Sequence, residues 1–292
     1  MIANGLDRRD RAPARAGIPA VAWMLIGAAA VHAIVHALRA GMINRAPYVQ
    51  PAGVIGVLEA AAGFLLPAAI IIGVDRWPAG RRWLLGAAAL FTIAGVLNLG
   101  MQAWFAWSQT QDLPMISDTV QSVMVARAFV SVSATTVGMF LVAGGLWLAR
   151  PPRSVRGRRG TAAAIAIGVL GLVALGGGLA LASIIRNDFR TSALYGLTAL
   201  GSGGTALVAI AALRCIPRRG TLPELLVAIG AALAVVAVAW THWLLVLQPL
   251  QDIPRELGWV IIFPVAIGVL GMLVAVVGFA FTRLFPQPEA HG

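Results

Sequence analysis

Eight long apolar segments follow one another along the chain, separated by short polar connections. A helix needs about 20 apolar residues to cross a bilayer core of roughly 30 Å. The segments are continuous and rich in Ala, Leu and Gly rather than alternating, which favours helices over membrane strands. The predicted spans are residues 18–40, 51–73, 83–108, 123–149, 161–185, 191–213, 223–247 and 257–282. We therefore expect an all-α, polytopic integral membrane protein with eight transmembrane helices.

The composition supports this class and excludes several kinds of chemistry. Hydrophobic residues make up 59% of the chain and charged residues 11%, with a mean hydropathy of +0.86, whereas a soluble domain has about 25% charged residues. The chain has no lysine, which excludes a Walker A loop and Schiff-base chemistry. Cys215 is the only cysteine, which excludes an intramolecular disulfide, a CxxC pair, a c-type haem and a thiolate-held iron–sulfur cluster.

The placement of arginine predicts the orientation of the chain. Sixteen of the 22 arginines lie in the N-terminal tail, at the C-terminus or in the gaps after the second, fourth and sixth spans, five lie in the other gaps, and Arg127 lies within a span. Cytoplasmic loops carry such an excess, so both termini are predicted to be cytoplasmic. Abundant Ala and Gly, with arginine in place of lysine, indicate a GC-rich bacterial genome and hence a bacterial inner membrane. The formal charge of +11 could suggest a nucleic-acid partner, but the arginines lie between apolar segments and not on one face. We therefore expect no nucleic-acid partner.

A short motif repeats with a constant offset. QDLP at 111–114 recurs as QDIP at 251–254, which is 140 residues later, and GVLEAAAGF from Gly56 faces GLTALGSGG from Gly196 at the same offset. We therefore predict two four-helix repeats, residues 1–150 and 151–292, and a four-span unit gives both the same orientation. The N-terminal segment also has some features of a signal peptide. We expect it to be retained, because its apolar run continues and the second repeat has a matching helix.

Polar residues recur at similar depth in the first four predicted spans. At 1.5 Å per residue, they lie about 5–10 Å from the midplane, or nearer the rim in the fourth span, all in the outer half of the membrane. Two pairs have a four-residue spacing and so share a helix face. The candidate site residues are His32, His36, Glu59, Asn98, Gln102 and Arg127.

The carboxylate of Glu59 suggests the chemistry of this polar layer. A charge at that depth costs about 2.5–3.5 kcal/mol on insertion scales, so we expect Glu59 to be protonated, or paired with a histidine or Arg127. A Glu/His pair can transfer a proton or hydrogen-bond a carbonyl such as that of a quinone. The structural alternative is that the polar layer only ties four helices together. At the 140-residue offset only Gln102 has a polar counterpart, His242, so the second repeat is predicted to be a degenerate copy.

About 60 residues of the first half resemble a known family. VHAIVHALRAGM followed by GVIGVLEAAAGFLLPAAIIIG is similar to the start of the DoxX-like family of small four-helix membrane proteins, with His36, Arg39 and Glu59 at the matching positions. This chain departs from the family in having Arg39 in place of the usual lysine and eight predicted spans instead of four. The resemblance implies an accessory membrane subunit, with the quinone-linked redox chemistry of some family members.

Other functions remain open at this point. A b-type haem would need two axial histidines, for which His36 and His242 lie at similar depth, but His242 beside Trp240 and Trp243 fits an aromatic belt at the interface better. No metal site is predicted. A proton-coupled transporter would use Glu59 as its proton carrier, and a non-catalytic scaffold or assembly factor would use the outer loops. The expected partners are the lipid bilayer and either another membrane protein or further copies of this chain.

Overall fold

A computed structural model gives the fold of the chain. The residues that it describes are 27, 30–31, 34, 56–58, 60–110, 118–149, 158–184, 189–215, 221–247, 263, 266–271, 273–275 and 277–278. Almost all of these residues are helical, and no strand occurs among them. The predicted all-α fold is confirmed for this part of the chain.

The helices begin and end close to the predicted apolar segments. The elements in chain order are α3 (Leu65–Gly73), the 3-10 turns η1 (Val74–Arg76) and η2 (Pro78–Gly80), α4 (Arg81–Thr110), α5 (Asp118–Leu148), α6 (Arg158–Ile184), α7 (Phe189–Cys215) and α8 (Thr221–Leu247). The ends of α4 to α8 differ from the predicted ends by up to five residues. Most of these helices extend past their apolar segments, because a helix can continue into the polar rim of the membrane, where α5 begins at Asp118.

Within the described residues, five helical segments are long and apolar enough to cross a membrane. These are Gly56–Gly73, Pro78–Ser108, Ser122–Leu148, Ala162–Ala180 and Ser192–Arg214, and two shorter apolar helices follow at Leu225–Ala237 and Ala266–Ala275. Large apolar side chains cover their outer surfaces: on α6, Leu172 is 68% exposed and Ile165 62% exposed. Soluble monomers rarely expose contiguous apolar surfaces of this kind, so lipid is their natural surrounding.

The second predicted span is not one continuous helix. Its described residues, 56–58 and 60–62, are helical, Gly63 and Phe64 form a turn, and the chain becomes helical again in α3. The turn is tight, because the Gly63 amide donates to the Ala60 carbonyl at 3.2 Å, three residues back. Pro67 explains the interruption, since it has no amide hydrogen and its ring clashes with the carbonyl four residues earlier, that of Gly63.

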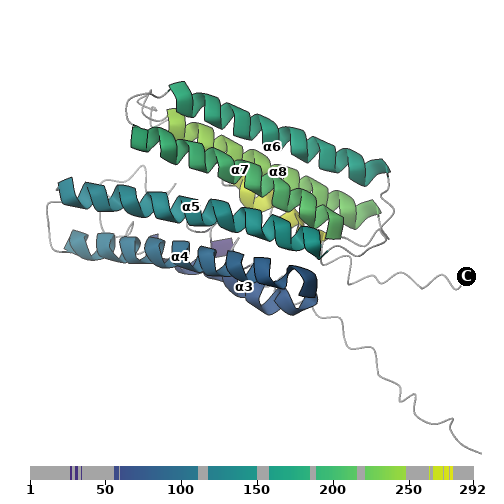
Figure 1. Ribbon diagram of the computed structural model, residues 1–292, viewed down its shortest axis with the longest axis horizontal. Helices are drawn as coiled ribbons and strands as arrows, with labels where there is room; N and C mark the ends of the chain where they lie inside the picture. The colour runs from purple at the N-terminus through teal and green to yellow at the C-terminus, as the bar shows by residue number, and fades with distance from the viewer. Residues whose placement is uncertain are drawn as a thin grey trace, which may run out of the picture.

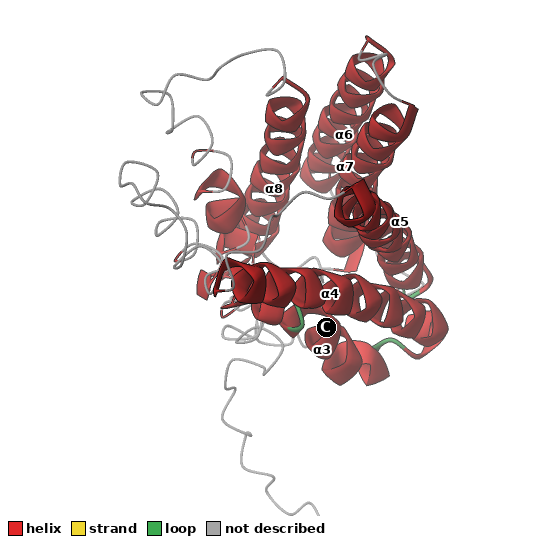
Figure 2. Ribbon diagram, turned by 90° about the vertical axis from the view of Figure 1, so that its left-hand side faces the viewer, coloured by secondary structure: helices red, strands yellow, loops and turns green. Residues whose placement is uncertain are grey.

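The long helices lie side by side in a bundle, with α5 between α4 and α7 (Figure 1). On one side α5 packs against α4, which packs against α3, and on the other side α5 packs against α7. α6, α7 and α8 contact one another in a second group, and the view turned by 90° shows the same two groups (Figure 2). The contact of α5 with α7 is as extensive as that of α5 with α4, so α5 joins the two predicted halves of the chain.

Missing side chains allow the helices to approach closely. A Cβ atom built on Gly80 would overlap the carbonyl oxygen of Gly145, and one on Gly171 would overlap the Cβ of Ala206. The first pair closes the junction between η2 and α5, and the second closes the α6–α7 contact. Such packing holds helices together in lipid, where the hydrophobic effect does not. Between α5 and α7, the buried Thr136 hydroxyl also donates to the Leu197 carbonyl at 3.1 Å.

The spacing of two helix starts equals the offset of the sequence repeat. α4 begins at Arg81 and α8 begins at Thr221, which is 140 residues later. The same offset relates Gly138 to Gly278. A Cβ on Gly138 would lie 2.7 Å from a ring carbon of Phe91 in α4, and a Cβ on Gly278 would lie 2.7 Å from a methyl of Val227 in α8.

Candidate functional site

The structure describes the side chains of three of the six predicted site residues: Asn98 and Gln102 on α4, and Arg127 on α5. His32, His36 and Glu59 lie outside the described residues. The two histidine side chains of the haem alternative also lie outside the described part of the chain. His36 is outside the described residues, and His242 lies within α8 but its side chain is outside the described part.

α4 and α5 bring their polar residues to the same level. Asn98 lies about 4 Å past the middle of the 30-residue α4, toward Thr110. Arg127 lies about 9 Å from the middle of the 31-residue α5, toward Asp118. The connection between the two helices runs from Thr110 to Asp118, so both displacements are toward the same end of the bundle.

Arg127 and Asn98 meet directly across the two helices. The Nη1 of Arg127 donates to the Oδ1 of Asn98 at 2.9 Å. The hydroxyl of Ser131, one turn further along α5 and buried, donates to the same oxygen at 3.5 Å. The buried Nε of Arg127 has no hydrogen-bond partner within the part of the chain that the structure describes. The guanidinium is therefore held at one end by a neutral amide and still has a buried donor to satisfy.

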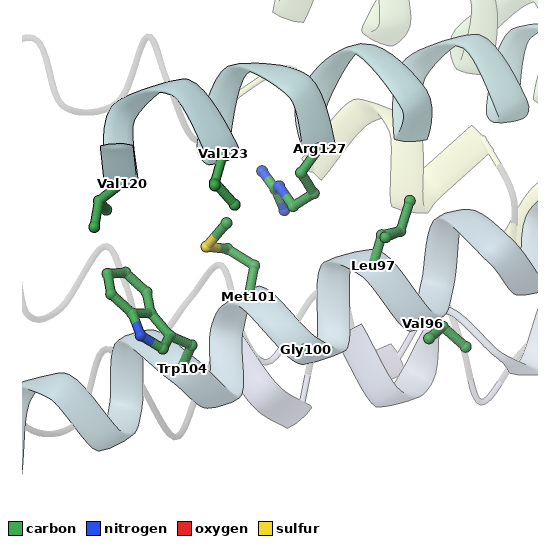
Figure 3. Close-up of a pocket in the computed structure, with 8 residues that line it drawn as sticks. All are labelled: Val96, Leu97, Gly100, Met101, Trp104, Val120, Val123 and Arg127. Carbon is green, nitrogen blue, oxygen red and sulfur yellow. The ribbon is translucent and has the colours of Figure 1, made fainter. Parts of the chain in front are cut away.

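An apolar groove lies between α4 and α5 with Arg127 in its wall (Figure 3). We call it the α4–α5 groove. Its volume is about 480 Å³, within the usual range for small-molecule sites. Arg127 projects from α5 into the space above Met101 (Figure 3). The lining residues are Val96, Leu97, Gly100, Met101 and Trp104 of α4, and Val120, Val123 and Arg127 of α5.

A second cavity, of about 410 Å³, also has Arg127 in its wall. This second cavity is more polar than the groove, because Asn98, Gln102 and Thr135 contribute to it. It is lined by Gly56, Ala60, Gly63, Leu66, Phe91, Ala94, Gly95, Asn98, Gln102, Arg127, Thr135 and Met139. Arg127 is thus shared by an apolar groove and a polar cavity, and a molecule in either one can approach its guanidinium.

Gln102 is held against the second predicted span. A Cβ built on Gly56 would overlap the Oε1 of Gln102 and would lie 2.8 Å from its Cδ. The absence of a side chain at Gly56 therefore makes room for the carboxamide. Three segments of the first half, at Gly56, on α4 and on α5, converge on the second cavity. In the sequence, Glu59 stands between Gly56 and Ala60, and both of these line that cavity.

The charge of this region is unbalanced within the described residues. Every described side chain that lines the groove or the second cavity is uncharged except that of Arg127. A guanidinium stays protonated in proteins, and a charge that is removed from water is costly unless a partner compensates it. The arrangement can therefore hold a group that accepts hydrogen bonds, with apolar surface beside it for the rest of the molecule.

Sequence reasoning overlooked several residues of this site. Ser131 lies four residues after Arg127 and so shares its helix face, the same spacing that identified Asn98 with Gln102. Val120 and Val123 lie seven and four residues before Arg127, on the same face. The groove itself had no signal in the sequence, because its α4 wall consists of residues that would suit a lipid-facing surface equally well.

Comparisons with protein-family models, with curated proteins and with solved structures give no match. The function is therefore inferred from the geometry and chemistry of this chain's own residues.

Proposed function

We propose that this protein is a multi-pass inner-membrane protein that binds a small, largely apolar molecule with a hydrogen-bond-accepting head, of the quinone type, between α4 and α5. The observation that carries the proposal is the position of Arg127. Its Nη1 donates to Asn98, its buried Nε has no partner in the described part of the chain, and its side chain lines both the apolar groove and the second cavity.

The α4–α5 groove suits the apolar part of such a molecule. Its wall is aliphatic apart from Trp104, Met101 and Arg127. Val96 and Val123 are more than half exposed, so the groove opens on the surface that faces lipid, and a ligand dissolved in the bilayer can enter without crossing water. A carbonyl oxygen of the ligand would then accept a hydrogen bond from the guanidinium. A hydrogen bond to a charged donor contributes about 1.5–3 kcal/mol.

Proton exchange with the ligand is assigned to the other predicted residues. The sequence predicts three further titratable groups of the first repeat at a similar membrane depth: His32, His36 and Glu59. A carboxyl group and an imidazole can supply and accept protons when a quinone is reduced or oxidised. This part of the proposal agrees with the resemblance to the DoxX-like family, which implies an accessory, redox-linked membrane subunit. The proposal assigns no electron donor to this chain, so the electrons for quinone reduction would come from another molecule.

Native mass spectrometry in mild detergent tests the binding. The protein is incubated with a short-chain benzoquinone, and wild type is compared with Arg127→Gln and Glu59→Gln. Arg82→Gln is the matched control, because Arg82 is an exposed arginine at the start of α4. We expect an adduct in wild type and in the control, and its loss in Arg127→Gln. No adduct in any variant would overturn the proposal. Uptake of a solute into vesicles without an adduct would favour a transporter, and a co-purifying protein alone would favour a scaffold.

The proposal extends to eight spans in two parallel repeats with both termini in the cytoplasm. It is supported by the 140-residue offset, which relates the QDLP and QDIP motifs, the starts of α4 and α8, and the close contacts of Gly138 and Gly278. The arginine distribution supports the orientation.

Cysteine labelling in intact cells tests the topology. In a Cys215→Ala background, single cysteines are placed in 111–114 and in 251–254. Both should react with a membrane-impermeant maleimide, because both loops are predicted to be outside. Reaction at only one of the two sites would refute the parallel repeat.

A further inference from the structure

The charge balance of the α4–α5 groove points to the charge of its ligand. We propose that the head of the ligand is an anion, so that the preferred occupant is a carboxylate-headed amphiphile such as a long-chain fatty acid. This inference rests on the proposed function, since it names the class of molecule that the groove takes. It keeps the apolar molecule with a hydrogen-bond-accepting head and replaces the neutral quinone-type head by a carboxylate, so the two kinds of ligand compete for the same donors of Arg127.

The first step is the count of charges and acceptors around the guanidinium. Within the described lining of the groove and the second cavity, Arg127 is the one charged side chain. Its described acceptor is the neutral Oδ1 of Asn98, and that oxygen is shared with the Ser131 hydroxyl at 3.5 Å. A neutral amide solvates part of a cation but does not neutralise it. A positive charge removed from water is best compensated by an anion that also accepts its hydrogen bonds.

The second step is the geometry of the donors. The Nε of Arg127 is buried and has no partner among the described residues, while Nη1 is already engaged with Asn98. A guanidinium binds carboxylates through two parallel hydrogen bonds when a pair of its donors faces the same way. Binding through Nε and the other terminal nitrogen, Nη2, would satisfy the buried donor and leave the bond to Asn98 intact. A single carbonyl oxygen supplies fewer acceptor sites than a carboxylate does.

The third step is the shape of the site. The groove continues from Arg127 along apolar residues toward Trp104 and Val120 in one direction and toward Val96 in the other (Figure 3). A cation in the wall of an otherwise apolar groove is complementary to a molecule with one charged end and a hydrocarbon chain. Because the groove opens toward lipid, amphiphiles of the bilayer reach it by lateral diffusion.

Asn98→Asp is the first variant, and it leaves the side-chain volume almost unchanged. It places a carboxylate at the position where Oδ1 now lies, 2.9 Å from Nη1, so the protein supplies its own anion. The ion pair keeps α4 and α5 together while it competes with an anionic ligand. Arg127→Lys is the second variant, since it keeps the charge but removes the two-bond geometry of the guanidinium. Arg82→Gln again serves as the control.

The experiment measures binding of three probes to the full-length protein in nanodiscs of neutral lipid: palmitate, hexadecanol and a short-chain benzoquinone. Binding is read from quenching of Trp104 by brominated forms of the two chain probes, with Trp104→Phe subtracted, and from native mass spectrometry for all three. We expect wild type to bind palmitate about ten- to a hundredfold more tightly than hexadecanol, which corresponds to the gain from a charged hydrogen bond. Asn98→Asp should abolish this preference, Arg127→Lys should reduce it, and Arg82→Gln should retain it.

The outcomes separate this inference from the proposed function. Benzoquinone binding that depends on Arg127, together with equal affinities for palmitate and hexadecanol, would overturn the anionic ligand and leave the quinone-type site intact. Absence of binding by all three probes would refute both proposals. A palmitate preference that persists in Asn98→Asp would show that the anion is bound elsewhere.

Discussion

Replacing Asn98 by leucine removes the acceptor of the Arg127 Nη1 hydrogen bond and keeps a side chain of similar size. The 2.9 Å bond crosses from α5 to α4 and has a charged donor. A buried donor that loses its acceptor costs about 1–3 kcal/mol in the free energy of unfolding. Because Arg127 is only partly buried, we expect Asn98→Leu to destabilise the protein by about 1–2 kcal/mol.

The double variant Asn98→Leu/Arg127→Leu removes both members of the pair. Replacing a buried polar pair by apolar side chains is often neutral or stabilising, so we expect its stability to lie within about 1 kcal/mol of wild type. The two substitutions are therefore non-additive, with a coupling free energy of about 1–2 kcal/mol. The double variant should nevertheless bind no ligand in the groove. Recovered stability without recovered binding would identify the pair as a functional site rather than a tie between helices.

Reversible unfolding in mixed detergent micelles, followed by circular dichroism of the helices, measures these free energies. Ser183→Ala is the control, since this exposed hydroxyl donates to the Ala180 carbonyl within its own helix at 2.7 Å and its removal should change little. Strict additivity of the two single substitutions would refute the direct interaction. Non-additive substitutions, with no ligand bound by wild type, would favour the structural role of the polar layer.

Two further predictions concern the packing of the helices. Gly80→Ala should lower the melting temperature, because the new methyl would overlap the Gly145 carbonyl, whose backbone cannot rotate away. Overpacking of about 1–3 kcal/mol corresponds to a decrease of about 2–6 °C, which tryptophan fluorescence would measure. An unchanged melting temperature would contradict the close approach of the two glycines. Gly100→Ala is its control, since nothing lies within 4 Å of its added Cβ. Thr136→Val should lower the free energy of unfolding by about 0.5–1.5 kcal/mol, because it loses a 3.1 Å hydrogen bond between α5 and α7. Thr92→Val, the control, loses only a hydrogen bond within its own helix. Equal effects of the two substitutions in chemical unfolding would argue against the bond between helices.

The apolar segments by themselves determined which parts of the chain are helical. Each predicted span from 83–108 to 223–247 corresponds to one helix, because a segment in lipid must satisfy its backbone hydrogen bonds internally and a helix does so. The interruption at Gly63 and Phe64 was also readable in principle. Pro67 is visible in the sequence, and its effect on the carbonyl four residues earlier is a general rule.

The polar residues show where local reasoning stops. Depth along a helix follows from residue number, so the sequence could place Asn98 and Arg127 at a similar level. It could not show that they touch at 2.9 Å, or that Ser131 shares the same oxygen. Those facts depend on how α4 and α5 are rotated about their axes, and helices that are apolar on most sides carry little information about that rotation.

The lateral arrangement of the helices was decided by the tertiary structure alone. The place of α5 between α4 and α7 follows from close packing at small residues such as Gly204 against Met139. Many other positions in this chain are just as small. The groove and the second cavity are both lined by residues of α4 and α5 that only the tertiary structure brings together, Arg127 among them. In lipid, the hydrophobic effect brings a segment into the membrane but does not choose its neighbours there. That choice depends on shape and on the few available hydrogen bonds.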